Sequence, residues 1–216
     1  MTSPAFSGGD GVWRQVLAQR SAEPPRPALF LDRDGVIVEE VLYLHRVEDV
    51  AFIPGAGETI AAANRRGVAV VVVTNQAGIG RGYYGWREFE EVHQAILAGL
   101  GRCGARLDAA LACPYHPLGV PPYLHDCHPA RKPQPGMLLQ AADLLGIDLA
   151  RSWIVGDKAS DLLAGRSAGL RGGLLVLTGH GPQHRDAALA LRTPEFEVRL
   201  AGSIADCAAL IDSLSS

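Results

Sequence analysis

The chain has 216 residues, of which 20 are basic and 23 acidic, and its formal net charge at neutral pH is −3. This length favours one α/β domain with a continuous core, and no basic run is dense enough to follow a nucleic-acid backbone. No stretch is apolar for long enough to span a bilayer, and the first 27 residues lack the features of a signal peptide. We therefore expect a cytoplasmic protein with no nucleic-acid or membrane partner, and we also expect a monomer.

Residues 1–26 are predicted to form an N-terminal extension that ends in a stiff linker. Glycines gather near its start, and Pro24, Pro25 and Pro27 close it. Within this extension, residues 11–22 are compatible with a short helix. Residues 27–216 then form the main domain.

Apolar runs and helical patterns alternate along the main domain. The runs that predict buried strands span residues 27–32, 68–75, 153–157 and 173–179. The patterns that predict helices span residues 55–67, 86–104 and 135–146. This alternation predicts a Rossmann-like, doubly wound parallel sheet flanked by helices. Ligands bind such sheets beyond the carboxyl ends of the strands, where Asp32, Thr74 and Asp157 fall.

Two carboxylates follow the first buried run. Asp32 and Asp34 are two residues apart, and Gly35 comes where the chain must turn. Two anions at a strand end are costly unless a cation neutralises them. A calcium-binding loop is the weaker interpretation, because the further acidic ligands of such loops are missing.

A hydroxyl and two cations come later in the chain. The Thr74 hydroxyl and the backbone N–H groups after it could hold phosphate oxygens. Lys132 is a compact cation suited to phosphate, and the fork of Arg131 suits bidentate contact with an oxyanion. The plainer interpretations are a strand cap for Thr74 and solvated charges for the two cations.

A second acid pair follows the run at 153–157. Asp157 has Lys158 beside it and Asp161 one helical turn later. By itself this pattern is typical of a helix N-terminus with a favourable first-turn acid. The order of an acid pair, a hydroxyl, a lysine and another acid pair is more specific than any of its parts.

This order resembles the haloacid dehalogenase (HAD) superfamily of phosphohydrolases over residues 28–212. The resemblance implies a Mg²⁺-dependent phosphatase without a large cap domain. It implies that Asp32 attacks phosphorus, while Asp34 protonates the leaving oxygen and later takes a proton from water. It also implies that Asp32, the Asp34 carbonyl and Asp157 hold Mg²⁺, and that Thr74 and Lys132 stabilise the transferring phosphoryl group.

Four segments narrow the resemblance: LFLDRDGVIVEE, VVVTNQAGIGRGYY, CPYHP and RKPQPGMLLQAA. They are similar to the D-glycero-D-manno-heptose 1,7-bisphosphate 7-phosphatases, whose nearest relatives are the histidinol-phosphate phosphatases. The resemblance implies that the substrate is a small phosphorylated sugar. The substrate-binding residues that it implies are Glu40, Tyr43, Asn75, Arg131 and Lys158.

Two alternatives to a heptose bisphosphatase stay open. Val41 and Leu42 replace a polar residue and a glycine that are usual in the family. Histidinol phosphate or another sugar phosphate is therefore an alternative substrate. A non-catalytic protein that binds a phosphorylated ligand is the alternative from another class, and the complete set of acids argues against it.

The loop at 112–130 is expected to act as a small substitute for a cap. In the family this loop binds structural zinc through three cysteines and one histidine, and here Cys113 matches the first ligand. Tyr115, His128 and Ala130 stand at the other ligand positions, so a regular site cannot form. The alternative is that the loop has lost the metal and is held by its prolines. The candidate zinc ligands are Cys113, His116, Cys127 and His128, and His125 is a further candidate that could take the place of His116 or Cys127.

Overall fold

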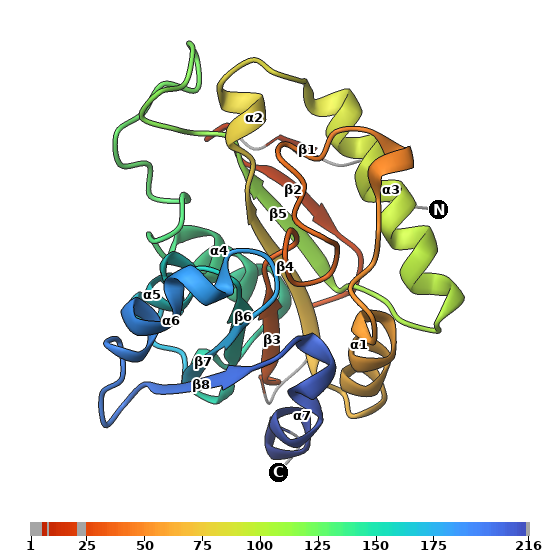
Figure 1. Cartoon of the computed structure of the whole chain (residues 1–216), viewed down its shortest axis with the longest axis vertical. Coiled ribbons are helices and arrows are strands. Elements are labelled where there is room, and N and C mark those ends of the chain that lie inside the picture. The colour runs from red at the N-terminus through yellow and green to blue at the C-terminus, as the bar shows by residue number, and fades with distance from the viewer. Residues whose placement is uncertain (1–5, 8, 21–24, 215–216) are drawn as a thin grey trace.

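The centre of the molecule is an eight-stranded sheet, seen in the computed structural model that describes residues 6–7, 9–20 and 25–214 (Figure 1). Its strand order is β1-β2-β5-β4-β3-β6-β7-β8. The strands are β1 (Phe6–Ser7), β2 (Trp13–Val16), β3 (Ala28–Leu31), β4 (Ala69–Asn75), β5 (Ala109–Cys113), β6 (Trp153–Gly156), β7 (Gly172–Val176) and β8 (Glu197–Ala201).

The six strands from β5 to β8 in this order run parallel, whereas β1 and β2 are antiparallel to their neighbours. From β3 the chain continues to β4 and β5 on one side, and later to β6, β7 and β8 on the other. The order therefore reverses between β3 and β6, which is where doubly wound sheets bind ligands. The predicted Rossmann-like, doubly wound sheet is confirmed.

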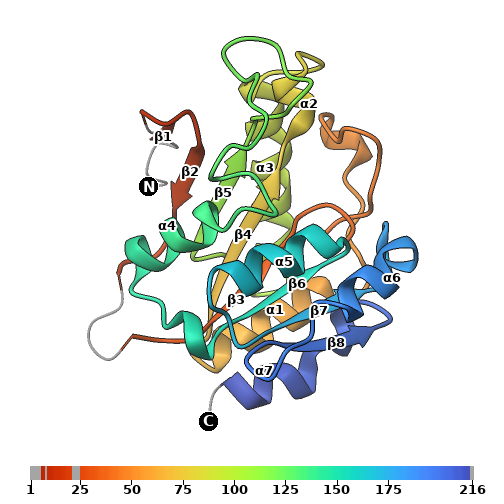
Figure 2. The ribbon, with the colours of Figure 1, turned by 90° about the vertical axis from the view of Figure 1, so that its left-hand side faces the viewer.

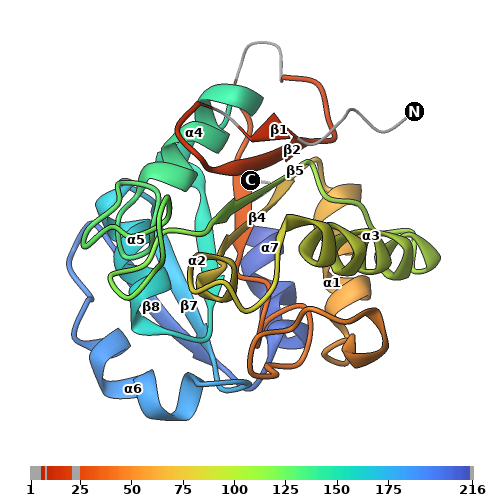
Figure 3. The same cartoon turned by 90° about the horizontal axis from the view of Figure 1, so that it is seen from above.

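Helices cover both faces of the sheet (Figure 3). One face packs against α1 (Ala56–Arg65), α3 (Trp86–Arg102) and α7 (Ala208–Leu214). The other packs against α4 (Gly136–Leu145), α5 (Ala159–Ser167) and α6 (Gly181–Leu189). Side chains alternate between these two cores, since Leu29 and Leu31 join the first and Phe30 the second. The remaining short elements are α2 (Ala77–Gly80) and three 3₁₀ turns at Val47–Asp49, Leu149–Arg151 and Ile204–Cys207.

The four predicted strands and three predicted helices of the main domain are all present, with ends that differ by a few residues. The short helix expected within residues 11–22 is wrong, because Trp13–Val16 form β2. Burial alternates along β2 with the period of a strand, so that Trp13 and Gln15 are buried while Arg14 and Val16 are only partly covered. The proposed division of the chain at residue 26 stays a prediction, and β2 is hydrogen-bonded to β5 of the same sheet.

No large cap covers the carboxyl end of the sheet. Residues 114–135 join β5 to α4 without a helix or a regular strand, and this loop projects beyond the sheet beside α2 (Figure 2). Within the described ranges, no helix has the length and apolar character needed to cross a membrane.

Candidate active site

A cleft of about 470 Å³ opens at the carboxyl ends of β3, β4 and β6, and the strand order reverses between β3 and β6. All of the residues predicted to be catalytic or substrate-binding line this cleft, although they come from segments far apart in the sequence. They are Asp32, Asp34, Glu40, Tyr43, Thr74, Asn75, Arg131, Lys132 and Lys158.

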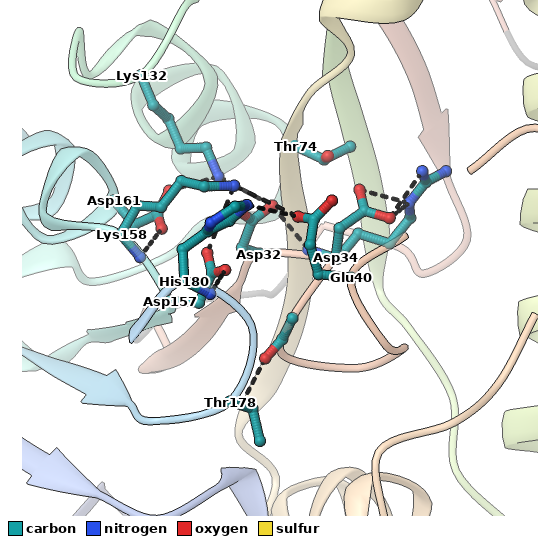
Figure 4. Close-up of polar contacts among 12 residues, drawn as sticks. Asp32, Asp34, Glu40, Thr74, Lys132, Asp157, Lys158, Asp161, Thr178 and His180 are labelled. Carbon is teal, nitrogen blue, oxygen red and sulfur yellow. Dashed lines mark hydrogen bonds and ion pairs between the residues drawn. The ribbon is translucent and has the colours of Figure 1, made fainter. Parts of the chain in front are cut away.

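Lys132 lies at the floor of the cleft beside the predicted nucleophile. Its ammonium nitrogen is 3.0 Å from Asp32 Oδ1 and 2.7 Å from Asp161 Oδ1, and it donates to the carbonyl of Val73 at 2.8 Å (Figure 4). Burial disfavours this charge, but Asp161 and Asp32 outweigh burial and raise the pKa of Lys132 above its ordinary value. Lys132 is therefore a fixed cation whose charge is shared by two carboxylates.

The backbone of Lys132 is fixed as firmly as its side chain. The Asn75 side chain donates to the Lys132 carbonyl at 3.0 Å and accepts from the Lys132 N–H at 3.1 Å. Asn75 thus clamps the segment that carries Lys132 to the end of β4, and it does so while lining the cleft.

Asp157 lies buried beside Asp32. Its Oδ2 accepts from the backbone N–H of His180 at 2.8 Å, and Gly35, at φ 77°, leaves room for it because a Cβ there would overlap this carboxylate. Its Oδ1 is buried without a hydrogen bond, and the nearest cation, Lys158 Nζ, is 3.8 Å away. Burial first and Asp32 second raise the pKa of Asp157 to about 7.

These acids fit a hard divalent cation. Ligand oxygens of Asp32, Asp157 and Asp161 all lie within 4.8 Å of one another. Oxygen-rich, negatively charged sites of this kind suit Mg²⁺, and the unpaired Oδ1 of Asp157 is a buried acceptor that such an ion would satisfy. The carboxylate of Asp34 does not belong to this group, and the expectation that Asp34 contributes only its carbonyl stays a prediction.

The Asp34 carboxylate points to a polar network on the other side of Asp32. Arg33 Nε is 3.2 and 3.1 Å from its two oxygens, and Gln76 Nε2 donates to Oδ2 at 3.3 Å. Gln76 Nε2 also donates to the Thr74 hydroxyl at 2.9 Å, and Gln76 Oε1 accepts from the Tyr84 hydroxyl at 2.6 Å. Gln76 therefore connects the predicted acid with the predicted phosphate ligand Thr74.

A second group of charges forms one wall of the cleft. Lys158 Nζ lies 3.4 Å from Glu40 Oε2, and His180 Nε2 lies 3.6 Å from the same oxygen. Burial, followed by the charge of Asp34, raises the pKa of Glu40. This wall carries groups that can donate to or accept from a hydroxylated ligand.

Tyr43 and Arg131 are positioned by residues outside the cleft. Tyr43 has a left-handed backbone, with φ of 60°, and its hydroxyl accepts from Arg81 at 3.1 Å. The Arg131 guanidinium donates to the carbonyl of Tyr115 at 2.9 Å. Among the described residues, neither Arg81 nor Arg131 forms an ion pair with a carboxylate.

The predicted zinc site is not formed. Among the described residues, no set of three ligand atoms within 4.8 Å of one another includes Cys113, His116, Cys127 or His128. Cys113 is buried at the end of β5, and burial raises the pKa of its thiol to about 11. The Nδ1 atoms of His116 and His128 accept backbone N–H groups, and the His128 ring stacks on Tyr115. The residues present in this loop do not fit zinc.

Four site residues were missed from the sequence. The sequence pattern includes Asp161 as a member of the second acid pair but gives it no role in the site, and it gives Arg33 no role at all. Gln76 directly follows β4, and His180 lies in the turn between β7 and α6, but nothing in their spacing marks them as partners of Asp34 and Glu40. Their roles depend on loop conformations that the sequence pattern does not reveal.

Comparison with known proteins agrees with this geometry. A sequence model of the HAD-hydrolase-like family matches residues 129–201. A D-glycero-β-D-manno-heptose-1,7-bisphosphate 7-phosphatase of Mesorhizobium japonicum is 48% identical over 166 residues, which cover 77% of this chain and 76% of the relative. The chain belongs to this family of HAD-like phosphatases.

Two solved structures resemble this HAD-like phosphatase. A protein from Mesorhizobium loti described as HAD-like phosphatase superposes with a TM-score of 0.86 at 40% identity, covering 98% of this chain and 97% of its own. The D,D-heptose 1,7-bisphosphate phosphatase of B. bronchiseptica, in complex with magnesium and phosphate, superposes with a TM-score of 0.72 at 29% identity. This match covers 87% of this chain and 97% of the B. bronchiseptica chain. The match with the first structure extends over almost the whole phosphatase chain.

Proposed function

We propose that this phosphatase removes a phosphate from a small phosphorylated sugar through a phospho-aspartate on Asp32, with Mg²⁺ as cofactor. The observation that carries the proposal is the position of Asp32 between Lys132 and Asp157 at the floor of the cleft. Asp32 Oδ1 accepts from the Arg33 N–H at 2.7 Å and contacts Lys132 Nζ at 3.0 Å. Both contacts use Oδ1, so Oδ2 is the oxygen we assign as the nucleophile.

The reaction has two steps. Asp32 Oδ2 forms a bond to phosphorus while the bond from phosphorus to the sugar oxygen breaks, and that oxygen takes a proton from Asp34. Water then attacks phosphorus and gives a proton to Asp34, and the bond between phosphorus and Asp32 breaks to release phosphate. Lys132 and Thr74 are fixed donors for the phosphoryl oxygens, and loss of one such donor typically costs ~10²–10³ in rate.

The proposed Mg²⁺ would be held by Asp32, the Asp34 carbonyl and Asp157. When bound, it offsets the repulsion between the Asp32 carboxylate and the phosphoryl group. Two observations support this assignment: the unpaired buried Oδ1 of Asp157, and the magnesium in the B. bronchiseptica relative.

D-glycero-D-manno-heptose 1,7-bisphosphate is the substrate we propose. The relatives with this activity in their names support it, as does a cleft wall of charged and hydrogen-bonding groups, among them Glu40, Arg131 and Lys158. Val41 and Leu42 also line the cleft, which makes one part of it less polar. The expectations of a monomer, of a cytoplasmic location and of no nucleic-acid or membrane partner stay predictions from the sequence.

A substrate panel tests this function. We expect kcat/KM to be highest for the heptose bisphosphate when purified protein with Mg²⁺ is assayed against sugar phosphates, histidinol phosphate and nucleotides. Asp32→Asn should keep the thermal stability of the fold and lose turnover, because an amide keeps the shape of the carboxylate but cannot form the acyl phosphate. A preference for nucleotides, or wild-type activity in Asp32→Asn, would falsify the proposal.

A further inference from the structure

The N-terminal segment 10–16 contacts the start of the loop that carries Arg131, and it also contacts α4, the helix that follows this loop. Tyr115 lies at the start of the loop, two residues after the end of β5, and its hydroxyl donates to the Asp10 carbonyl at 3.1 Å. β2, which follows Asp10, pairs with β5. Beyond the loop, Gln140 on α4 accepts from Arg14 Nε at 3.1 Å and from Arg14 Nη2 at 2.8 Å. Gln140 also donates to Asp10 Oδ2 at 3.2 Å, so one short segment links β5, Tyr115 and α4.

Gly11 makes the approach of Tyr115 possible. Its φ is 72°, and a Cβ at this position would overlap the phenolic oxygen of Tyr115. The ring therefore passes directly over the Gly11 backbone, at a place where only glycine leaves room for it.

Tyr115 also faces the rest of the loop. Its ring stacks on His128 with centroids 3.8 Å apart, and it meets Tyr123 and His125 edge-on at 5.6 and 5.9 Å. Its carbonyl oxygen accepts from the Arg131 guanidinium at 2.9 Å. The side chain of Tyr115 is thus held by residues 10–11, and the backbone carbonyl of Tyr115 in turn holds Arg131, which lines the cleft.

Lys132 does not depend on this arrangement. It is fixed by Asn75 through its backbone and by Asp32, Asp161 and the Val73 carbonyl through its ammonium group. A change at Tyr115 should therefore move Arg131 and leave the residues around the scissile phosphate in place.

We propose that residues 10–16 position Arg131 for the substrate, with Gly11 and Tyr115 as positioning residues, and that these contacts hold the loop where no zinc does. The inference rests on the proposed substrate-binding role of Arg131. It assigns to the N-terminal segment a function in substrate discrimination rather than in phosphoryl transfer.

The test compares two substrates in one enzyme preparation. The measured quantity is kcat/KM for the best sugar phosphate of the panel divided by kcat/KM for nitrophenyl phosphate, which offers Arg131 no distal polar group. The fraction of active enzyme cancels in this ratio, so a purely structural loss does not change it. Arg131→Ala should lower the ratio, because it removes a charged hydrogen bond to the sugar phosphate.

Gly11→Ala is expected to lower the ratio by about tenfold, the size of one lost charged hydrogen bond, because the new methyl group displaces Tyr115. Gly67→Ala is the matched control, since Gly67 has φ of 74° and nothing within 4 Å of a Cβ. It imposes the same backbone strain and should leave the ratio unchanged. Tyr115→Phe, which removes only the hydroxyl that binds Asp10, should lower the ratio by about threefold.

A double variant distinguishes the two proposals. With Arg131→Ala already present, Gly11→Ala should not lower the ratio further, because both changes act on the same contact. If Arg131→Ala lowers the ratio and Gly11→Ala does not, the positioning role is wrong and the proposed function stands. If Arg131→Ala has no effect, the substrate role of Arg131 fails and this inference fails with it. Equal effects of Gly11→Ala and Gly67→Ala would also overturn the inference.

Discussion

Asp34 is the residue whose contacts bear most directly on the chemistry of the leaving group. Its carboxylate is held by Arg33 and Gln76, and it lines the cleft next to Asp32. An acid that protonates the leaving oxygen matters most when that oxygen leaves as a poorly stabilised alkoxide. Nitrophenolate needs no such proton.

We therefore predict that Asp34→Asn slows sugar-phosphate hydrolysis by ~10²–10⁴-fold and slows the first turnover of nitrophenyl phosphate far less. Rapid-mixing measurements of nitrophenolate release follow that first turnover without the later step in which water is activated. The melting temperature of the variant serves as control for the lost contact with Arg33. Equal losses on both substrates would rule out Asp34 as the general acid.

Asp157 allows a prediction about the metal. Its pKa is raised to about 7 by burial and by Asp32, so a proton competes with the cation for this carboxylate. We expect activity to be lost in excess EDTA and restored by Mg²⁺. The Mg²⁺ concentration at half-maximal activity should rise about tenfold between pH 8 and pH 6. Full activity after removal of bound metal would exclude the assignment, and an unchanged midpoint would show that Asp157 is not a ligand.

At the scale of elements, the first turn of α5 combines a helix cap with an ion pair. Asp161 Oδ2 accepts from the Lys158 N–H at 2.9 Å, and Asp161 Oδ1 contacts Lys132 at 2.7 Å. Both Asp161 and Lys132 are buried. Loss of Asp161 would leave the buried ammonium group of Lys132 with Asp32 as its remaining carboxylate partner, and loss of a charged hydrogen bond inside the protein is more costly than loss of a cap alone.

We predict that Asp161→Asn lowers the free energy of unfolding by about 2 kcal/mol and lowers kcat by ~10-fold or more, because Lys132 loses the nearer of its two carboxylates. Asp206→Asn is a matched control. Asp206 makes the same kind of cap, accepting from the Ser203 N–H at 3.0 Å, but without a buried lysine. Urea unfolding of both variants compares the loss of a cap together with an ion pair, in Asp161→Asn, with the loss of a cap alone, in Asp206→Asn. Similar destabilisation in the two variants would mean that the ion pair contributes little.

The elements that the sequence predicted are those with strong local signals. β4 contains a run of four valines followed by Thr74 and Asn75, and α3 repeats apolar residues with helical spacing. β5, with the sequence AALAC, was missed because alanine has a low intrinsic preference for strands, and this segment is a strand only through its pairing with β2 and β4. β2, with the sequence WRQV, was missed for a different reason: it is short, and β5, with which all four of its residues pair, lies far along the chain.

For the molecule as a whole, the parallel sheet explains why the site could be predicted as a set of residues but not as a geometry. Asp32, Thr74 and Asp157 must meet because their strands end at the same edge of the sheet. The network of Arg33 and Gln76, and the contact between Gly11 and Tyr115, depend on loop conformations and on tertiary packing. The two alternatives for the loop at 112–130 could not be separated from the sequence for the same reason, because the candidate zinc ligands lie near one another in sequence but contact other partners in the fold.

A buried histidine joins β2 to α3. His93 on α3 donates from Nε2 to Gln15 Oε1 on β2 at 2.8 Å, and its ring packs edge-on against Trp13 and stacks on Phe89. Burial, and to a smaller extent Arg33, lowers the pKa of His93 from 6.5 to about 4. Protonation of His93 would therefore place an unpaired charge between the two parts of the fold.

The stability of the molecule should depend on pH through this residue. Between pH 6.5 and pH 4 the unfolded chain binds a proton at His93 that the folded protein does not, so the unfolded state gains stability as the pH falls. We predict that the free energy of unfolding of the wild type relative to His93→Phe falls by about 2 to 3 kcal/mol between pH 7.5 and pH 4.5. Taking the difference between the two proteins cancels the opposite contribution of Asp157, because both proteins keep that residue. Chemical unfolding of both proteins at the two pH values measures this difference in the free energy of unfolding. A difference that is the same at both pH values would mean that His93 is not held neutral in the fold.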